Sequence, residues 1–271
     1  AGLFASGTKA ARRDFVAAYP FDLSPTTDDR PFFFDIFRHD DLSGWLAAPH
    51  MRLLRDLLGS LALLSLLLIL MPVLRDRRPE ARAGLWISAP YFACLGFGFL
   101  FVEVWLLSRF SMYLGHHTYG LSVVLSGLLI ASGAGAYLTD RLPWLARVRA
   151  QVAAFALIGL LALLCTFLDA LTSSTLAQPL GVRMLTTLLA ILPLGLCMGV
   201  CMPAGLLHLQ ARARSTLPLC IGINGFASVL ATITVLPLSL YYGYWGVLVT
   251  GALLYLLAGV LASFFERSAR T

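Results

Sequence analysis

Long apolar runs alternate with short, arginine-bearing segments from about residue 53 to residue 265 of this chain. Each run is about as long as a helix must be to cross a hydrocarbon core of roughly 30 Å at 1.5 Å per residue. The seven runs cover residues 53–74, 84–107, 119–138, 148–168, 184–207, 217–240 and 245–265. Because a backbone in lipid must satisfy its own polar groups, such runs are expected to be helices. The pattern therefore predicts an all-α, polytopic transmembrane bundle of about seven spans.

Composition supports this class. The 271 residues are 59% hydrophobic and 13% charged, whereas a soluble domain has about 25% charged residues. Transmembrane barrels are disfavoured because their strands alternate apolar and polar residues. The net charge of +6 resides mostly in short loops, where it orients helices. We therefore expect the lipid bilayer, and not nucleic acid, as a partner. All five cysteines fall inside apolar runs, so no disulfide framework is implied.

Residues 1–50 differ from residues 51–271, which form the predicted transmembrane domain. Residues 17–25 are turn-rich, residues 26–31 read as a tight polar turn, and aromatic residues crowd positions 32–37. Fifty residues are too few for a convincing independent core. We predict a mostly irregular segment, the tail of a preceding soluble domain that serves as an interfacial linker. The chain begins with Ala1 and shows no signal-peptide pattern, so we expect it to be part of a longer or processed protein.

The arginines predict an orientation. Loops 75–83, 139–147 (with Arg149 just beyond) and 208–216, together with the C-terminus, carry 11 arginines, and the alternate loops carry two. Positive loops face the cytoplasm, which with seven spans places residues 1–50 on the opposite side. If the run 53–74 did not span, both ends of the chain would be cytoplasmic.

Glu103 is the sharpest single signal for chemistry. It lies deep within an apolar run, where a carboxylate costs on the order of 3 kcal/mol, so it should face a partner or a cavity. It is either a proton-coupled or cation-binding carboxylate, or a structural hydrogen-bonding group. Arg109 follows six residues later, about 240° around a helix, so the two side chains should find separate partners.

Other polar residues are candidates for the same cavity. His116 and His117 stand in the loop 113–119 and could bind a metal or relay protons, or simply sit at headgroup level. Asn224 lies between Gly222 and Gly225 and could bond across helices or line a polar cavity. Asp140 and Asp169 fall near the ends of runs, where we expect them to be solvated.

Two further patterns favour packing over chemistry. Cys197, Cys201 and His208 share a helix face and are soft-metal ligands, but no second pair of ligands is apparent. Small residues in 131–136, with Gly195 and Gly199, allow close helix approach. Prolines within the runs should kink the helices or break them locally: Pro72, Pro90, Pro193, Pro203 and Pro237.

Several segments together resemble the bacterial multi-spanning spermidine-synthase-like proteins, in which a soluble Rossmann-type domain similar to aminopropyltransferases is fused to membrane helices. The matching segments are Thr27–Phe34 (with Asp28, Asp29, Arg30 and Pro31), Leu95–Glu103 running on to Arg109, Leu114–Tyr119, Met202–Gly205 and Gly222–Val229. They extend over most of the chain from about residue 20 to residue 260.

The resemblance implies that the family's soluble domain binds decarboxylated S-adenosylmethionine and a polyamine acceptor. Such a domain needs a strand, a Gly-rich turn and an acidic ribose partner, none of which occurs in this sequence. We therefore assign no catalytic residue, cofactor or metal within this chain, and leave open whether it belongs to an enzyme.

Three functions follow as hypotheses. The first is a bacterial inner-membrane domain that anchors a preceding soluble domain and presents a polar cavity near Glu103, Arg109, His116, His117 and Asn224, lined by broken fifth and sixth helices. The second is a secondary transporter of polyamines or other small cations, with Glu103 as the coupling carboxylate. The third is a membrane-embedded enzyme that acts on lipid through His116 or His117. The small-molecule ligand is left unassigned.

Overall fold

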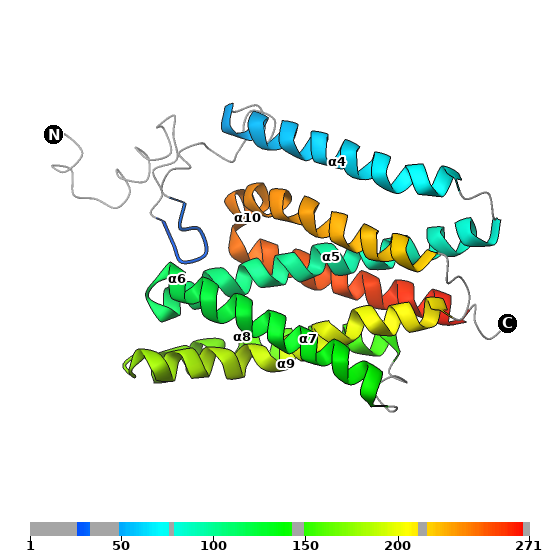
Figure 1. The fold of residues 1–271 in the computed structure, drawn as a ribbon. Helices are drawn as coiled ribbons and strands as arrows, with labels where there is room; N and C mark the ends of the chain where they lie inside the picture. The colour runs from blue at the N-terminus through cyan, green and yellow to red at the C-terminus, as the bar shows by residue number, and fades with distance from the viewer. Residues whose placement is uncertain (1–25, 33–48, 76–78, 143–148, 211–215, 268–271) are drawn as a thin grey trace.

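The computed structural model describes residues 26–32, 49–75, 79–142, 149–210 and 216–267. Within these ranges every regular element is a helix and none is a strand (Figure 1). The helices are α4 (Pro49–Arg75), α5 (Pro79–Leu114), α6 (His117–Gly120), the π-helix η1 (Leu121–Leu125), α7 (Ser126–Arg141), α8 (Ala150–Thr175), α9 (Leu180–Gln210) and α10 (Leu217–Arg267). The prediction for residues 1–25 and 33–48 lies outside the described residues.

The helical class predicted from the apolar runs is confirmed. In the described part of the chain, five helices are long and apolar enough to cross a membrane. They are Ser88–Leu114, His117–Arg141, Ala150–Thr175, Leu180–Leu207 and Leu217–Ser263. These helices indicate a multi-pass membrane protein.

The last two apolar runs share one element, α10, which reverses direction at Gly243. This glycine has φ 75° and ψ 176°, a region that essentially only glycine occupies. The reversal divides α10 into a first arm, residues 217–242, and a second arm, residues 244–267. Figure 1 shows the two arms running in opposite directions.

The prolines do not break the fifth and sixth runs, so that part of the prediction is wrong. Pro193 and Pro203 lie inside α9, and Pro237 lies inside the first arm of α10. In lipid, neighbouring helices and local adjustment compensate for the one hydrogen bond that a proline removes. In the described helices the interruptions lie instead at Gly243 and at η1, through which the chain enters α7.

Two closely packed helix pairs make up much of the bundle. The first pair is α5 with α10, and the second is α7 with α9; α8 packs against α9 and α10, while α4 lies outside against α10. Small residues make both pairs close: a Cβ at Gly96 would meet the backbone of the first arm, and one at Gly199 would meet the backbone of Ser132. The predicted role of the small residues in 131–136 and of Gly199 is therefore confirmed for the pair α7 and α9.

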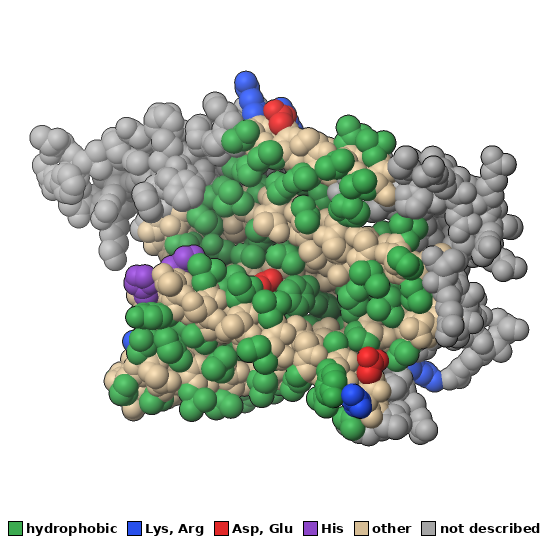
Figure 2. Space-filling view, in the orientation of Figure 1, with side chains coloured by type: hydrophobic (Ala, Val, Ile, Leu, Met, Phe, Trp, Pro, Cys, Tyr) green, Lys and Arg blue, Asp and Glu red, His purple; other side chains and the backbone are tan. Residues whose placement is uncertain are grey.

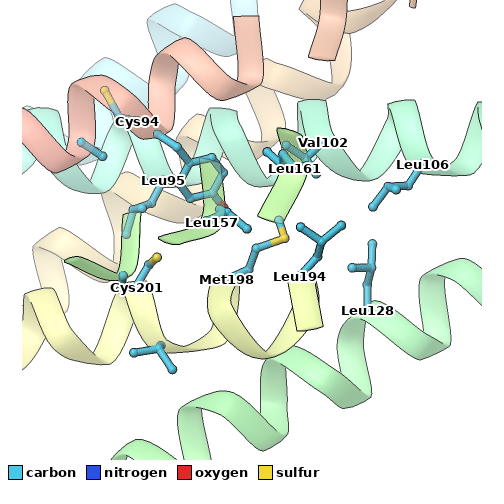
Figure 3. Packing of buried hydrophobic residues seen from close by; sticks show 14 of the residues in the cluster. Cys94, Leu95, Val102, Leu106, Leu128, Leu157, Leu161, Leu194, Met198 and Cys201 are labelled. Atoms are coloured by element: carbon cyan, nitrogen blue, oxygen red, sulfur yellow. The ribbon is translucent and has the colours of Figure 1, made fainter. Parts of the chain in front are cut away.

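The core of the bundle lies between α5, α8, α9 and α10. Figure 3 shows Leu194 and Met198 of α9 directed towards Val102 of α5 and towards Leu157 and Leu161 of α8. Outside, α4 exposes most of its described leucines. Figure 2 shows a largely hydrophobic face with charged side chains mostly towards its edges. Apolar side chains both inside and outside are what a helix bundle in lipid requires.

Candidate functional site

A polar turn, residues 26–32, fastens the N-terminal part of the chain to the reversal of α10. The carboxylate Oδ1 of Asp29 accepts a hydrogen bond from the Trp245 backbone N–H at 2.7 Å, and the Asp29 carbonyl accepts one from the Tyr244 N–H at 3.0 Å. Arg30 donates through Nη2 to the Tyr241 carbonyl at 2.7 Å. We call the turn 26–32 with these three bonds the clasp.

The clasp caps two helix ends at once. The first N–H groups and the last C=O groups of a helix have no partner within it. Asp29 supplies an acceptor where the second arm begins, and Arg30 supplies a cationic donor where the first arm ends. Both charges match the ends of the helix dipoles. Each cap is worth about 1 kcal/mol.

Internal bonds shape the clasp before it meets the bundle. The Arg30 N–H donates to the Thr27 carbonyl at 2.9 Å, and Thr27 N–H donates to the Arg30 carbonyl at 3.3 Å. Phe32 places its ring 5.5 Å from that of Tyr244, centroid to centroid. Pro31, which lies between Arg30 and Phe32 in the sequence, is exposed. Polar and aromatic contacts thus act on the same reversal.

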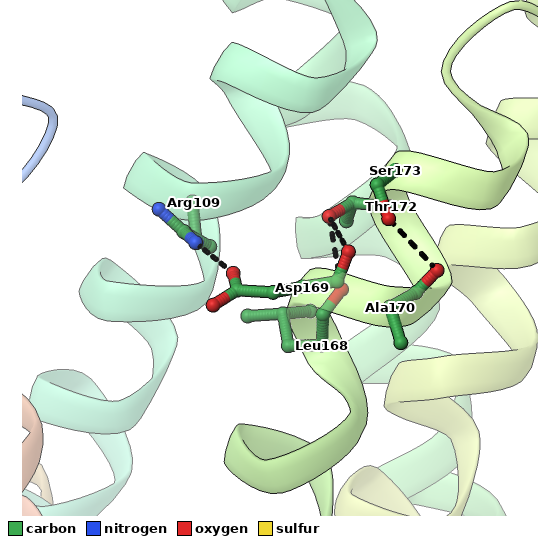
Figure 4. Close-up of polar contacts among 6 residues, drawn as sticks. All are labelled: Arg109, Leu168, Asp169, Ala170, Thr172 and Ser173. Atoms are coloured by element: carbon green, nitrogen blue, oxygen red, sulfur yellow. Dashed lines mark hydrogen bonds and ion pairs between the residues drawn. The ribbon is translucent and has the colours of Figure 1, made fainter.

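Arg109 lies near the clasp and pairs with Asp169 of α8 (Figure 4). The pair joins α5 to α8. This agrees with the expectation that Arg109 does not share the helix face of Glu103 and finds a separate partner. The Asp169 side chain is 82% exposed, in agreement with the prediction that it is solvated. That prediction did not include its pairing with Arg109. A small cavity of about 30 Å³ beside Arg109 is also lined by Asp28, Asp29 and Trp105, with room for about one water.

His116 caps the N-terminus of α6 and His117 is the first residue of that helix; both are exposed. His116 Nδ1 accepts a hydrogen bond from the Thr118 N–H at 3.3 Å, which is the capping contact of α6. Its ring centroid lies 5.6 Å from that of Tyr119. These contacts are structural.

Glu103 lies near the middle of the span Ser88–Leu114. Only 6% of it is exposed, and among the described residues it has no hydrogen bond or ion pair. Phe99 and Leu100 lie one helical turn from Glu103. Both line a second, larger cavity of the bundle. A buried carboxyl group without a partner is costly at this depth.

Asn224 lies on the first arm of α10 and lines a cavity of about 560 Å³, which we call the interhelical cavity. Its walls come from α5, α7, α9 and α10, so the cavity separates the pair α5/α10 from the pair α7/α9. Most of the lining is apolar; Ser132, Ser228 and Tyr255 join Asn224 as its polar members.

The five candidate residues therefore fall in four places. Arg109 joins Asp28 and Asp29 at the small cavity, Asn224 lines the interhelical cavity, Glu103 lies one turn from that cavity, and the histidines are exposed. Sequence analysis missed the pairing of Asp169 with Arg109 and the place of Ser228 in the cavity wall. The count of arginines could have suggested Asp169 as a partner, because Arg109 needs an anion at its own depth in the membrane.

The cysteine face of α9 makes ordinary packing contacts. Cys197 Sγ lies 3.2 Å from the Ala153 carbonyl, and Cys201 Sγ lies 3.4 Å from the Cys197 carbonyl. No group of three or more potential metal ligands occurs among the described residues.

Comparison of the chain with protein-family models, with curated proteins and with solved structures finds no match. The resemblance to spermidine-synthase-like fusion proteins accordingly stays a prediction that rests on the motifs quoted above.

Proposed function

We propose that this chain is the seven-span membrane domain of a bacterial spermidine-synthase-like fusion protein, and that it holds a preceding soluble domain at the membrane surface. The observation that carries the proposal is the clasp. A segment that merely tethered a soluble domain would need no specific contact with the bundle, whereas Asp29 and Arg30 each bond to a helix end of α10.

The apolar runs and the reversal at Gly243 support a count of seven spans. With α4 counted as one pass and each arm of α10 as one, the described helices supply one pass for each run. The C-terminal ends of α4 and α7 and the start of α8 lie at one end of the bundle; the clasp and α6 lie at the other (Figure 1). The positive-inside rule then places loops 75–83, 139–147 and 208–216 in the cytoplasm of an inner-membrane protein and the clasp outside.

Hydrogen exchange tests the clasp. In the purified full chain, Asp29→Ala should speed exchange of the Tyr244 and Trp245 amides about 5- to 30-fold, because one to two kcal/mol of capping is lost. Asp28→Ala is the matched control: Asp28 is the adjacent carboxylate and bonds to neither amide in the described structure. Equal exchange in both variants would overturn specific fastening.

Chemical labelling tests the side of the membrane. A cysteine at Thr26 should react with a membrane-impermeant thiol reagent in spheroplasts, since the native cysteines are buried or half-buried. A cysteine at Asp140, at the other end of α7, should react only after the membrane is opened. The reverse pattern would contradict the proposal.

Glu103 is buried and has no partner among the described residues, which favours a second candidate, a secondary transporter of polyamines or other small cations. Proteoliposomes under an imposed pH gradient should then accumulate labelled spermidine, and Glu103→Gln should abolish the pH-dependent part. Asp140→Asn, an exposed acidic residue at a helix end, should leave uptake unchanged. Wild-type uptake no greater than that of protein-free vesicles would remove this candidate.

A further inference from the structure

The interhelical cavity combines an apolar wall with one unsatisfied amide. No charged side chain is among its lining residues. The Asn224 side chain makes no hydrogen bond to any described residue. The backbone carbonyl of Asn224 accepts a hydrogen bond from Ser228 Oγ at 3.1 Å. At 560 Å³ the cavity falls within the 300–1,000 Å³ of small-molecule sites, which are mainly apolar with a few placed polar groups.

A second polar group comes from a proline in the same wall. Pro203 has no N–H, so the Gly199 carbonyl, four residues earlier, loses its usual donor. Both residues line the cavity. The wall therefore holds, in addition to the carboxamide of Asn224, which donates and accepts, a backbone carbonyl that has lost its helical donor.

The depth of Asn224 limits what can bind there. It lies seven residues into α10, about 10 Å from the helix start, and therefore below the headgroups at the end of the bundle that carries the basic loops. Unmet polar groups at that depth cost several kcal/mol. A ligand group that both donates and accepts would satisfy them, and an ion would find no counter-charge in the lining.

The cavity also reaches the outer surface of the bundle. Leu129 of α7 lines it while 55% exposed, and Gly133, one turn on, is exposed as well. In a bilayer this surface meets acyl chains. A molecule with an aliphatic chain can therefore enter from the side, without passing through the polar ends of the bundle.

We propose that the interhelical cavity binds a neutral lipid whose hydroxyl or amide group bonds to Asn224 and whose aliphatic chain lies along α7 and α9. The proposal is independent of the clasp and of the soluble domain, because the cavity is lined by α5, α7, α9 and the two arms of α10 and by no residue of the clasp.

Photolabelling of the full chain in lipid nanodiscs tests this. The probe is a long-chain primary alcohol with a diazirine in its chain; the comparison probes are the same chain ending in a methyl group and in a primary ammonium. The alcohol should label peptides of α7 and α9 that contain lining residues at least five times more than either comparison probe.

Two variants and one control locate the site. A Cβ at Gly133 meets nothing within 4 Å, so the Cβ of Gly133→Phe is accommodated, and its ring at this lining position should occupy the cavity and remove the labelling. Asn224→Leu should lower labelling by the alcohol to the level of the methyl-ended probe. Gly225→Phe, next to Asn224 but outside the lining and also in open space, should change nothing. The melting temperature of Gly133→Phe should match that of Gly225→Phe.

Three results would overturn the proposal. Equal labelling by the alcohol and the methyl-ended probe would show ordinary lipid contact. Stronger labelling by the ammonium probe would show a cation site. Labelling that persists in Gly133→Phe would place the probe elsewhere.

Discussion

The spans formed by α5 and by α6 to α7 have the same mean hydropathy, yet 61% of the first and only 22% of the second is buried in the bundle. A soluble protein rarely shows such a contrast, since there hydrophobicity and burial go together. In lipid, an apolar helix enters the membrane whether or not other helices pack against it. The difference shows that other features decide which helix becomes central.

Close backbone approach is one such feature. α5 lies against both arms of α10, through Gly96 on one side and Gly98 against Tyr255 on another. By contrast, α7 packs mainly on α9, where a Cβ at Gly135 would meet the Leu196 backbone, and it leaves Ile130 72% exposed. Small residues on several faces make a central helix, and small residues on one face make a peripheral one.

The largest expected effect comes from truncating one large side chain on each helix. Leu106 of α5 is fully buried, so Leu106→Ala should lower the free energy of unfolding by about 2 kcal/mol or more through lost contacts and a cavity. Ile130→Ala on α7 should change it by less than about 0.5 kcal/mol. Unfolding in mixed micelles with increasing SDS measures both. Similar losses would contradict the contrast between the helices.

A smaller effect should follow from adding one methyl group to each helix. At Gly96 a Cβ would meet the Asn224 carbonyl oxygen, with Ala227 Cβ at 2.9 Å, so Gly96→Ala should cost about 1–3 kcal/mol. At Gly133 it meets nothing, so Gly133→Ala should be neutral or gain up to about 1 kcal/mol from helix propensity. The same unfolding assay applies; a stable Gly96→Ala variant would show that α5 and α10 can separate.

The smallest effect concerns the ion pair of α5 with α8. Arg109 and Asp169 have side chains 33% and 82% exposed, so a double-mutant cycle with Arg109→Gln and Asp169→Asn should give a coupling of at most about 1 kcal/mol. Because exposed charges are screened, the coupling should shrink as salt is added. A coupling that stays constant in high salt would mean that the pair is shielded from water.

The helices themselves could be predicted because length and apolarity determine them in lipid. The order of burial could not, since Leu106 and Ile130 look alike in the sequence. The reversal at Gly243 could be inferred only as a gap between two runs: the sequence Tyr-Tyr-Gly-Tyr-Trp carries no charged or proline stop, and the charges that cap it lie more than 200 residues earlier in the chain.

The candidate site shows the same limit. Glu103 and Asn224 stood out because polar residues are rare in apolar runs, and the structure gives both unusual surroundings. Their placement relative to one another depends on how α5 and α10 are rotated, which helical periodicity alone does not determine. Residues 26–31 were predicted to be a polar turn, but the sequence did not indicate that Asp29 and Arg30 bond to the reversal of α10.

The clasp has a consequence for biosynthesis. Asp29 and Arg30 leave the ribosome early, but the backbone groups that they cap belong to residues 241–245, which are made near the end. The clasp can therefore close only after all the other described helices have been synthesised, up to the last reversal. Contacts between residues so far apart in sequence form late, and this one joins the start of the described chain to its final helical hairpin. Its closure therefore requires that synthesis has passed Gly243, and a chain stopped before this residue would leave Asp29 and Arg30 without their partners in α10.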